Sequence, residues 1–149
     1  MSNSAELQSI AAAVTPAVMV SACGLLALGL DNQAARMTTR LRDLAKEFRT
    51  LAPGAPRRAA IRGEVMVLKE RHGFYTRALL SNYAALLSFV LTSTASLLQA
   101  LLGFSATAPL ALFGVGVVLL AMMAIFTLSA VRLSRKAIEL EERDVLSDA

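Results

Sequence analysis

The chain has 149 residues, of which 56% are hydrophobic and only 17% are charged, and its mean hydropathy is +0.58. This composition excludes a disordered segment, and a soluble domain of this length could not bury so many apolar side chains. Its single cysteine, Cys23, excludes an intrachain disulfide scaffold. The composition therefore predicts an integral membrane protein, and the meaning of the net charge of +4 depends on where the charges lie.

Three apolar stretches are long enough to cross a hydrocarbon core, which takes ~20 helical residues. They are residues 7–30, 79–102 and 109–131. Between the first two, residues 31–78 predict a cytoplasmic helical hairpin with its turn at 52–56, and residues 132–146 predict a further cytoplasmic helix. The first span is the richest in small and polar residues, which pack well between helices but poorly against lipid. We therefore expect it to be the inner helix of an assembly.

The positions of the basic residues predict the orientation. None of the 15 lysines and arginines precedes the first span, 11 lie between Arg36 and Arg77, none lies in residues 103–108, and four follow the third span. Loops with an excess of Lys and Arg stay in the cytoplasm. We expect the N-terminus outside and the C-terminus inside. A cleaved signal peptide is disfavoured because its basic leading segment is missing.

Two heptad seams predict that the spans continue as long helices beyond the membrane. The first seam is Cys23, Ala27, Leu30, Ala34, Met37, Leu41, Leu44, Phe48 and Leu51. The second is Ile61, Val65, Leu68, His72, Tyr75, Leu79 and Asn82. Two prolines and a glycine separate the seams, so we expect the first helix to end near Thr50 and the two helices to pair in antiparallel fashion.

Polar residues in the second span lie on one helical face: Ser81, Ser88, Thr92, Ser96 and Gln99. Hydroxyl and amide side chains in a membrane helix commonly bond to neighbouring helices. We interpret this face as an interhelical polar face. We favour static packing between helices over a functional role for this face.

A second stripe follows the first helix at a spacing of about seven residues. Its members are Gln8, Thr15, Ala22, Gly29 and Arg36, with Asn32 and Arg40 close by. In a symmetric ring such residues would repeat around the axis and line a narrow aqueous path. We treat these seven residues as candidate pore-lining residues; for the cytoplasmic charges, a solvated helix face is the favoured explanation.

Catalytic chemistry has little support. His72 is the only histidine and occupies a seam position, and no nucleotide-binding, metalloprotease or hydrolase motif occurs. We expect no enzyme activity, no metal and no cofactor. Nucleic acid is disfavoured because no aromatic platform accompanies the basic residues. An ion-coupled transporter is disfavoured because no charged residue lies inside a span.

One stretch resembles a known family. The run Thr15-Pro-Ala-Val-Met-Val-Ser-Ala-Cys-Gly-Leu-Leu, followed by Asn32, Arg36, Arg40 and Arg42, is similar to the N-terminal signature of a bacterial membrane family catalogued as domain of unknown function family 2721. Gln33 and Thr39 depart from that signature, which has arginine and aspartate there. The resemblance implies a three-span protein of the bacterial inner membrane and no particular activity.

The sequence thus predicts an all-α integral membrane protein that forms a symmetric homo-oligomer. Its expected partners are the lipid bilayer and copies of itself. The leading functional hypothesis is an ion channel with the first helix at the axis and an unidentified permeating ion. The alternative is a non-conducting scaffold or regulatory subunit whose cytoplasmic hairpin docks a partner.

Overall fold

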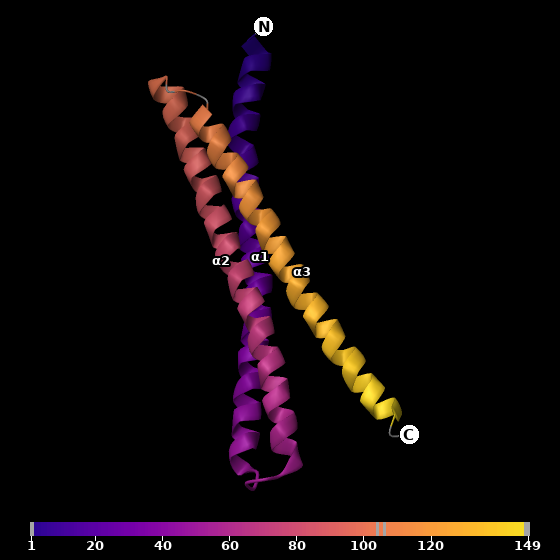
Figure 1. Ribbon diagram of the computed structural model, residues 1–149. Coiled ribbons are helices and arrows are strands. Elements are labelled where there is room, and N and C mark those ends of the chain that lie inside the picture. Colours follow the sequence, from indigo (N-terminus) through magenta and orange to yellow (C-terminus); the bar gives the residue numbers. More distant parts are fainter. Residues whose placement is uncertain (1, 104, 106, 148–149) are drawn as a thin grey trace. The chain divides into compact units, whose positions relative to one another are not determined.

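The computed structural model describes the backbone of residues 2–103, 105 and 107–147, and the side chains of residues 14–99, 101–103, 105 and 107–134. The described residues form three helices and no strand: α1 (Ser2–Thr50), α2 (Pro56–Leu102) and α3 (Thr107–Ser147) (Figure 1). Each contains a segment long and apolar enough to cross a membrane, within Val14–Thr50, Pro56–Gln99 and Thr107–Ser134. The all-α fold and the three apolar helices are confirmed.

The chain divides into two compact units, and each helix contributes to both. The first unit contains Met1–Gly29 and Leu79–Met123, and the second contains Leu30–Ala78 and Ala124–Ala149. The first unit therefore holds most of the three predicted spans, and the second holds the charged segments between and after them.

Glycine and proline residues mark the connections between the helices. α1 ends at Thr50, as its sequence predicts. In the turn that follows, Gly54 adopts a φ of +93°, which residues other than glycine rarely adopt. Pro56 is the first residue of α2, a position where the missing amide hydrogen costs nothing. At the other end of α2, Gly103 has a φ of +72° and its amide donates to the Gln99 carbonyl oxygen over 2.9 Å, which caps the helix.

Both heptad seams are buried. In the first seam Cys23, Ala27, Leu30, Met37 and Leu44 are buried, and the remaining four positions are half-buried. In the second seam Ile61, Tyr75 and Asn82 are buried, and the others are half-buried. The prediction of these two seams is confirmed, because a 3.5-residue spacing keeps the apolar side chains on the side of each helix that meets its neighbour.

The core of the first unit is small and centres on one aromatic side chain. Phe89 is fully buried, and its ring lies 5.5 Å from that of Phe113 between centroids, at a tilted angle. Cys23 and Ala85 are also fully buried in this cluster. A Cβ placed on Gly116 would lie 2.7 Å from Cε1 of Phe89, so only glycine lets α3 approach α2 this closely here.

Large apolar side chains elsewhere in the first unit point away from the core. More than 60% of the surface is exposed at each of Leu25, Leu80, Leu101, Leu110 and Val118. A soluble domain would not leave this many apolar side chains uncovered, whereas a lipid bilayer is their favourable surrounding. These surfaces fit contact with lipid.

Candidate functional site

The pore-lining candidates on α1 lie to one side of the buried seam. Thr15, Gly29, Asn32, Arg36 and Arg40 are exposed, and Ala22 is half-buried. The side chain of Gln8 lies outside the described residues. The structure therefore leaves most of this stripe uncovered by α2 and α3.

The polar face of α2, in contrast, is covered by the rest of the chain. Ser81, Ser88 and Thr92 are buried, and Ser96 and Gln99 are half-buried. The Ser88 hydroxyl donates to the Leu112 carbonyl oxygen on α3 over 2.7 Å, and the Thr92 hydroxyl donates to the Ser88 carbonyl oxygen of its own helix over 2.8 Å. Hydroxyls held in this way satisfy their hydrogen bonds without water.

A buried asparagine links α1 and α2. The Asn82 side chain is fully buried, and its Nδ2 donates to the main-chain oxygen of Cys23 over 2.8 Å. Its Oδ1 has no hydrogen-bond partner among the described residues. The heptad pattern placed Asn82 in the second seam but did not predict this hydrogen bond. A seam position identifies which helix a side chain faces, not which atom it contacts.

Two ion pairs join α1 to α2 in the second unit. The Arg40 guanidinium donates to Glu64 Oε1 through Nη2 over 2.7 Å and through Nε over 3.0 Å. Arg57 Nε donates to Glu47 Oε1 over 2.9 Å, and this hydrogen bond lowers the pKa of the Glu47 carboxyl and raises that of Arg57. One candidate pore residue, Arg40, is thus also a contact between the two helices.

These contacts share one antiparallel register. The two residue numbers add to 104 in the pairs Arg40 with Glu64 and Glu47 with Arg57, and to 105 in the pair Cys23 with Asn82. Such constancy follows from two regular helices joined by a short turn. The sequence patterns did not pair Glu47 or Glu64 with an arginine, although counting outward from Ala52 matches Glu47 with Arg57 and Glu64 with Arg40.

Two arginine side chains lie near the ring of an aromatic side chain close to the turn. The Arg58 guanidinium carbon lies 4.3 Å from the Phe48 ring centroid and that of Arg62 lies 5.7 Å away. Arg58 Nη2 also donates to the Phe48 carbonyl oxygen over 3.4 Å. Cation–π contacts of this kind hold planar guanidinium groups over an aromatic face.

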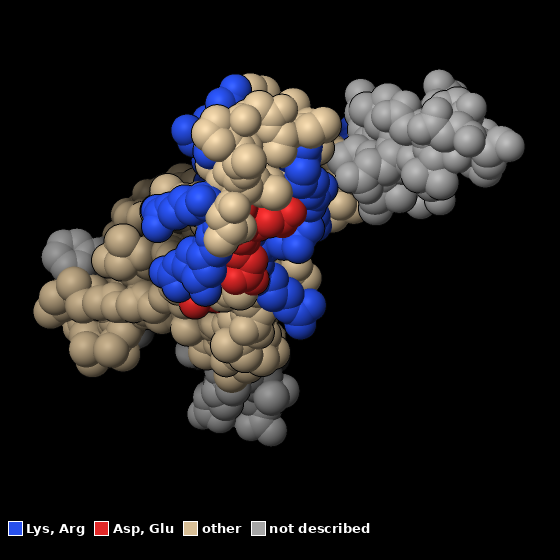
Figure 2. Space-filling view, turned by 90° about the horizontal axis from the view of Figure 1, so that it is seen from below, with Lys and Arg blue, Asp and Glu red and all other residues tan. Residues whose placement is uncertain are grey.

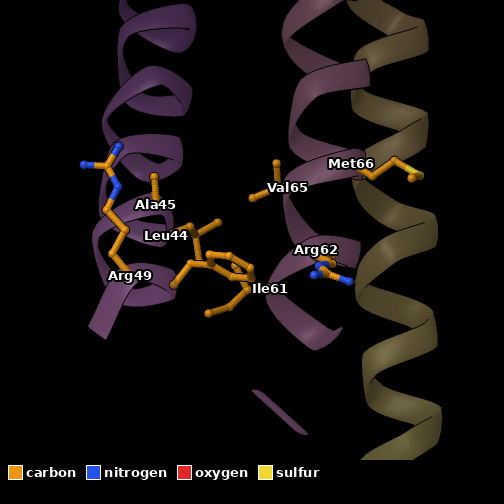
Figure 3. Close-up of a pocket in the computed structure, with 8 residues that line it drawn as sticks. Leu44, Ala45, Arg49, Ile61, Arg62, Val65 and Met66 are labelled. Atoms are coloured by element: carbon orange, nitrogen blue, oxygen red, sulfur yellow. The ribbon is translucent and has the colours of Figure 1, made fainter. Parts of the chain in front are cut away.

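Beside Phe48 lies a groove of about 520 Å³ between α1 and α2. We call it the arginine-rimmed groove; it is lined by Leu44, Ala45, Phe48, Arg49, Ile61, Arg62, Val65 and Met66. Figure 3 shows Leu44 and Ile61 between the two helices, whereas Met66 extends from the side of α2 that faces away from α1. The groove has an apolar floor and cationic edges.

Viewed from the end that contains the turn, the molecule is strongly charged. Figure 2 shows lysine and arginine side chains on both sides of a narrow strip of aspartate and glutamate. Asp43 belongs to the same charged region and lies 3.9 Å from Lys46 Nζ. The basic side chains exceed the acidic ones, so this surface favours an anionic partner or a negatively charged segment.

The described residues contain no arrangement with recognisable catalytic chemistry. No three His, Cys, Asp or Glu side chains gather there as metal ligands. His72 is half-buried in its seam, and its Nδ1 has no hydrogen-bond partner among the residues described. A single imidazole without a neighbouring nucleophile or carboxylate does not form a catalytic pair.

Comparison with known proteins identifies one family. The family model described as "Protein of unknown function (DUF2721)" matches residues 13–140. No curated protein and no solved structure matches the chain. The matched stretch includes the stripe on α1 from Thr15 onward, both seams and most of α3.

Proposed function

The chain belongs to the DUF2721 family, and we propose that it forms an oligomeric pore in the membrane in which α1 lines the axis and an ion permeates. The family assigns no activity, so the proposal depends on this chain's own residues. Its leading support is the contrast between the polar residues of α2 and those of α1.

The polar side chains of the two helices differ in how far they are buried. The hydroxyls of Ser88 and Thr92 on α2 are buried inside the chain, whereas Thr15 on α1, which also lies inside a predicted span, is exposed. Polar surface is unfavourable against hydrocarbon, so the exposed face of α1 is better covered by other copies or by water. A ring of copies with α1 innermost provides both.

The inner mouth of such a pore would carry Asn32 and Arg36. Both are exposed, and Arg36 has no hydrogen-bond or ion-pair partner among the described residues. Arg40 is 54% exposed at its side chain but is bound to Glu64, so its charge is partly neutralised. Rings of arginine attract anions, and the proposed pore therefore favours anions at this end.

The test is reconstitution in a planar bilayer with asymmetric salt. We expect single-channel current from the wild-type protein, and an altered conductance or reversal potential for Arg36→Gln. Arg42→Gln is the matched control because it removes the same charge from another face of α1. Light scattering in mild detergent should give a mass well above one 15.8 kDa chain. A monomeric mass, or equal effects of both substitutions, would contradict the proposal.

A second candidate is a non-conducting scaffold or regulatory subunit. The arginine-rimmed groove favours it, because an apolar floor with cationic edges can bind an amphipathic acidic helix. This hypothesis predicts no current from the wild type. It also predicts that neutralising Arg42, Lys46 and Arg49 abolishes partner binding.

A further inference from the structure

A second hollow lies on α2, close to the start of its predicted membrane span. It has a volume of about 470 Å³, and the described residues that line it are Met66, Lys69, Glu70, Gly73, Phe74 and Arg77. They follow one another in steps of three and one, so they share one face of the helix. Met66 extends from the side of α2 that faces away from α1 (Figure 3), so this face is not the one that pairs with α1.

The same face of α2 continues into the span as a stripe of exposed apolar residues. Counting onward from Gly73 and Arg77 in steps of seven leads to Leu80, Ala84, Leu87 and Leu91. All four are exposed, and the exposed fraction is 64% at Leu80 and 58% at Leu87. Exposed apolar side chains on a membrane helix are favourably covered by acyl chains. The hollow therefore lies directly above a surface that fits contact with lipid.

The two ends of the hollow lie at different depths. Arg77 is two residues before the predicted start of the span at Leu79, ~3 Å of helix, and Phe74 is five residues before it, ~7.5 Å. The headgroup layer extends about 5–8 Å beyond the hydrocarbon core on each side, so both residues lie within it. Lys69 and Glu70 lie ~15 Å and ~14 Å from the same point, beyond that layer, and their opposite charges offset each other.

The end of the hollow nearest the membrane is cationic and has an aromatic wall. The Arg77 guanidinium carbon lies 5.9 Å from the Phe74 ring centroid. Arg77 is exposed and makes no hydrogen bond or ion pair with any other residue that the structure describes. A guanidinium in this state can donate two parallel hydrogen bonds to phosphate oxygens. At Gly73 a Cβ would have nothing within 4 Å, so the space beside the arginine is open.

We propose that this end of the hollow binds the phosphate of an anionic phospholipid. Arg77 donates to the phosphate oxygens, Phe74 holds the guanidinium, and an acyl chain lies along the exposed stripe that begins at Leu80. Phosphatidylcholine carries the same phosphate, but Arg77 repels its quaternary ammonium, so the site prefers a lipid of net negative charge. The inference goes beyond the proposed pore, since it holds whether or not the protein conducts.

Native mass spectrometry of the full-length protein in mild detergent tests the role of the charge. The protein is offered equal amounts of phosphatidylglycerol and phosphatidylcholine with the same acyl chains. We expect the wild type to retain more of the anionic lipid. Arg77→Gln should lower the ratio of retained phosphatidylglycerol to phosphatidylcholine about fivefold, the effect of one basic residue at an anionic surface. The absence of a preference in the wild type would overturn the proposal.

Arg42→Gln is the matched control for the charge. Arg42 is exposed on α1 and lies twelve residues beyond the predicted end of the first span, ~18 Å of helix, which is outside the headgroup layer. This variant loses the same charge and should keep the wild-type lipid ratio. Equal losses in Arg77→Gln and Arg42→Gln would show that only net charge matters and would overturn the proposed site.

Filling the hollow tests its shape without changing any charge. Gly73→Leu should lower the retention of phosphatidylglycerol, because the new side chain occupies the space beside Arg77. Gly63→Leu is the control, since a Cβ there also has open space and the residue is 16 positions from the span, ~24 Å of helix. Equal retention by the two variants would overturn the assignment to the hollow.

A water-soluble competitor identifies the source of the phosphate. Glycerol 1-phosphate in large excess should leave the bound phosphatidylglycerol in place, because it lacks the acyl chains that contact the stripe. Displacement of the lipid would assign the site to a soluble phosphate compound and overturn the lipid proposal.

Discussion

The Asn82 side-chain amide donates a 2.8 Å hydrogen bond to the main-chain oxygen of Cys23, 59 positions earlier in the chain. The bond joins α1 and α2 inside the first unit, at a position that is fully buried on both sides. The residue numbers of its partners add to 105, close to the 104 of the two ion pairs. A buried polar contact of this kind favours one axial alignment of two helices whose apolar surfaces alone would permit sliding.

Removal of this bond should loosen the helix pair. Asn82→Ala should lower the free energy of unfolding by about 1 kcal/mol, the sum of an interhelical hydrogen bond and a small cavity. Alkylation of Cys23 by a maleimide should become faster, because the shorter side chain at position 82 leaves the Cys23 thiol more accessible. Thr94→Ala is the control, since that exposed hydroxyl donates only to Val90 of its own helix. Unchanged alkylation in Asn82→Ala would contradict the role of the bond.

The approach of α3 to α2 should depend on one glycine. Gly116→Ala should destabilise the protein by roughly 1–3 kcal/mol, because the new methyl group overlaps the Phe89 ring and the rigid ring must move. Gly114→Ala is the matched control, since a Cβ there has open space and alanine favours helix. Thermal unfolding followed by circular dichroism in detergent measures both. Combining Gly116→Ala with Phe89→Leu should recover part of the loss; no recovery would mean that the overlap is not the cause.

The Glu47–Arg57 pair should give stability that depends on pH. The hydrogen bond from Arg57 lowers the pKa of Glu47 in the folded state below its ordinary value of about 4.3. The stabilisation is therefore fully present above that ordinary pKa and is lost as the pH falls through the lower, folded-state value. Wild type should melt slightly higher than Glu47→Gln at pH 7, and the difference should vanish in strong acid. A difference that grows in acid would contradict this sign.

The orientation in the membrane should be measurable by thiol labelling. In a Cys23→Ala background, Asn3→Cys should react with an impermeant maleimide on intact cells, and Ala52→Cys should react only after the membrane is opened. Ala52 is preferred to Gly54 because the φ of +93° at Gly54 would strain any side chain. Labelling of Ala52→Cys on intact cells would reverse the predicted topology.

Much of the fold follows from the sequence because it depends on local periodicity. Each seam repeats every three or four residues, so the side chains that meet a neighbouring helix are identifiable without knowledge of that neighbour. The end of α1 at Thr50 and the start of α2 at Pro56 follow from proline and glycine chemistry in the same way. The apolar length of each helix likewise predicts that it can cross a membrane.

Tertiary structure decided which individual atoms meet. The sequence placed Arg40 beside a possible pore axis, and only the packing of α2 on α1 brought Glu64 within 2.7 Å of it. Likewise Ser88 was one of five polar side chains on its face, and only the packing of α3 supplied the Leu112 carbonyl oxygen as its partner. Periodicity specifies a face to within a fraction of a turn, whereas a hydrogen bond or a glycine contact such as Gly116 with Phe89 depends on ångström-scale separations between segments far apart in the chain.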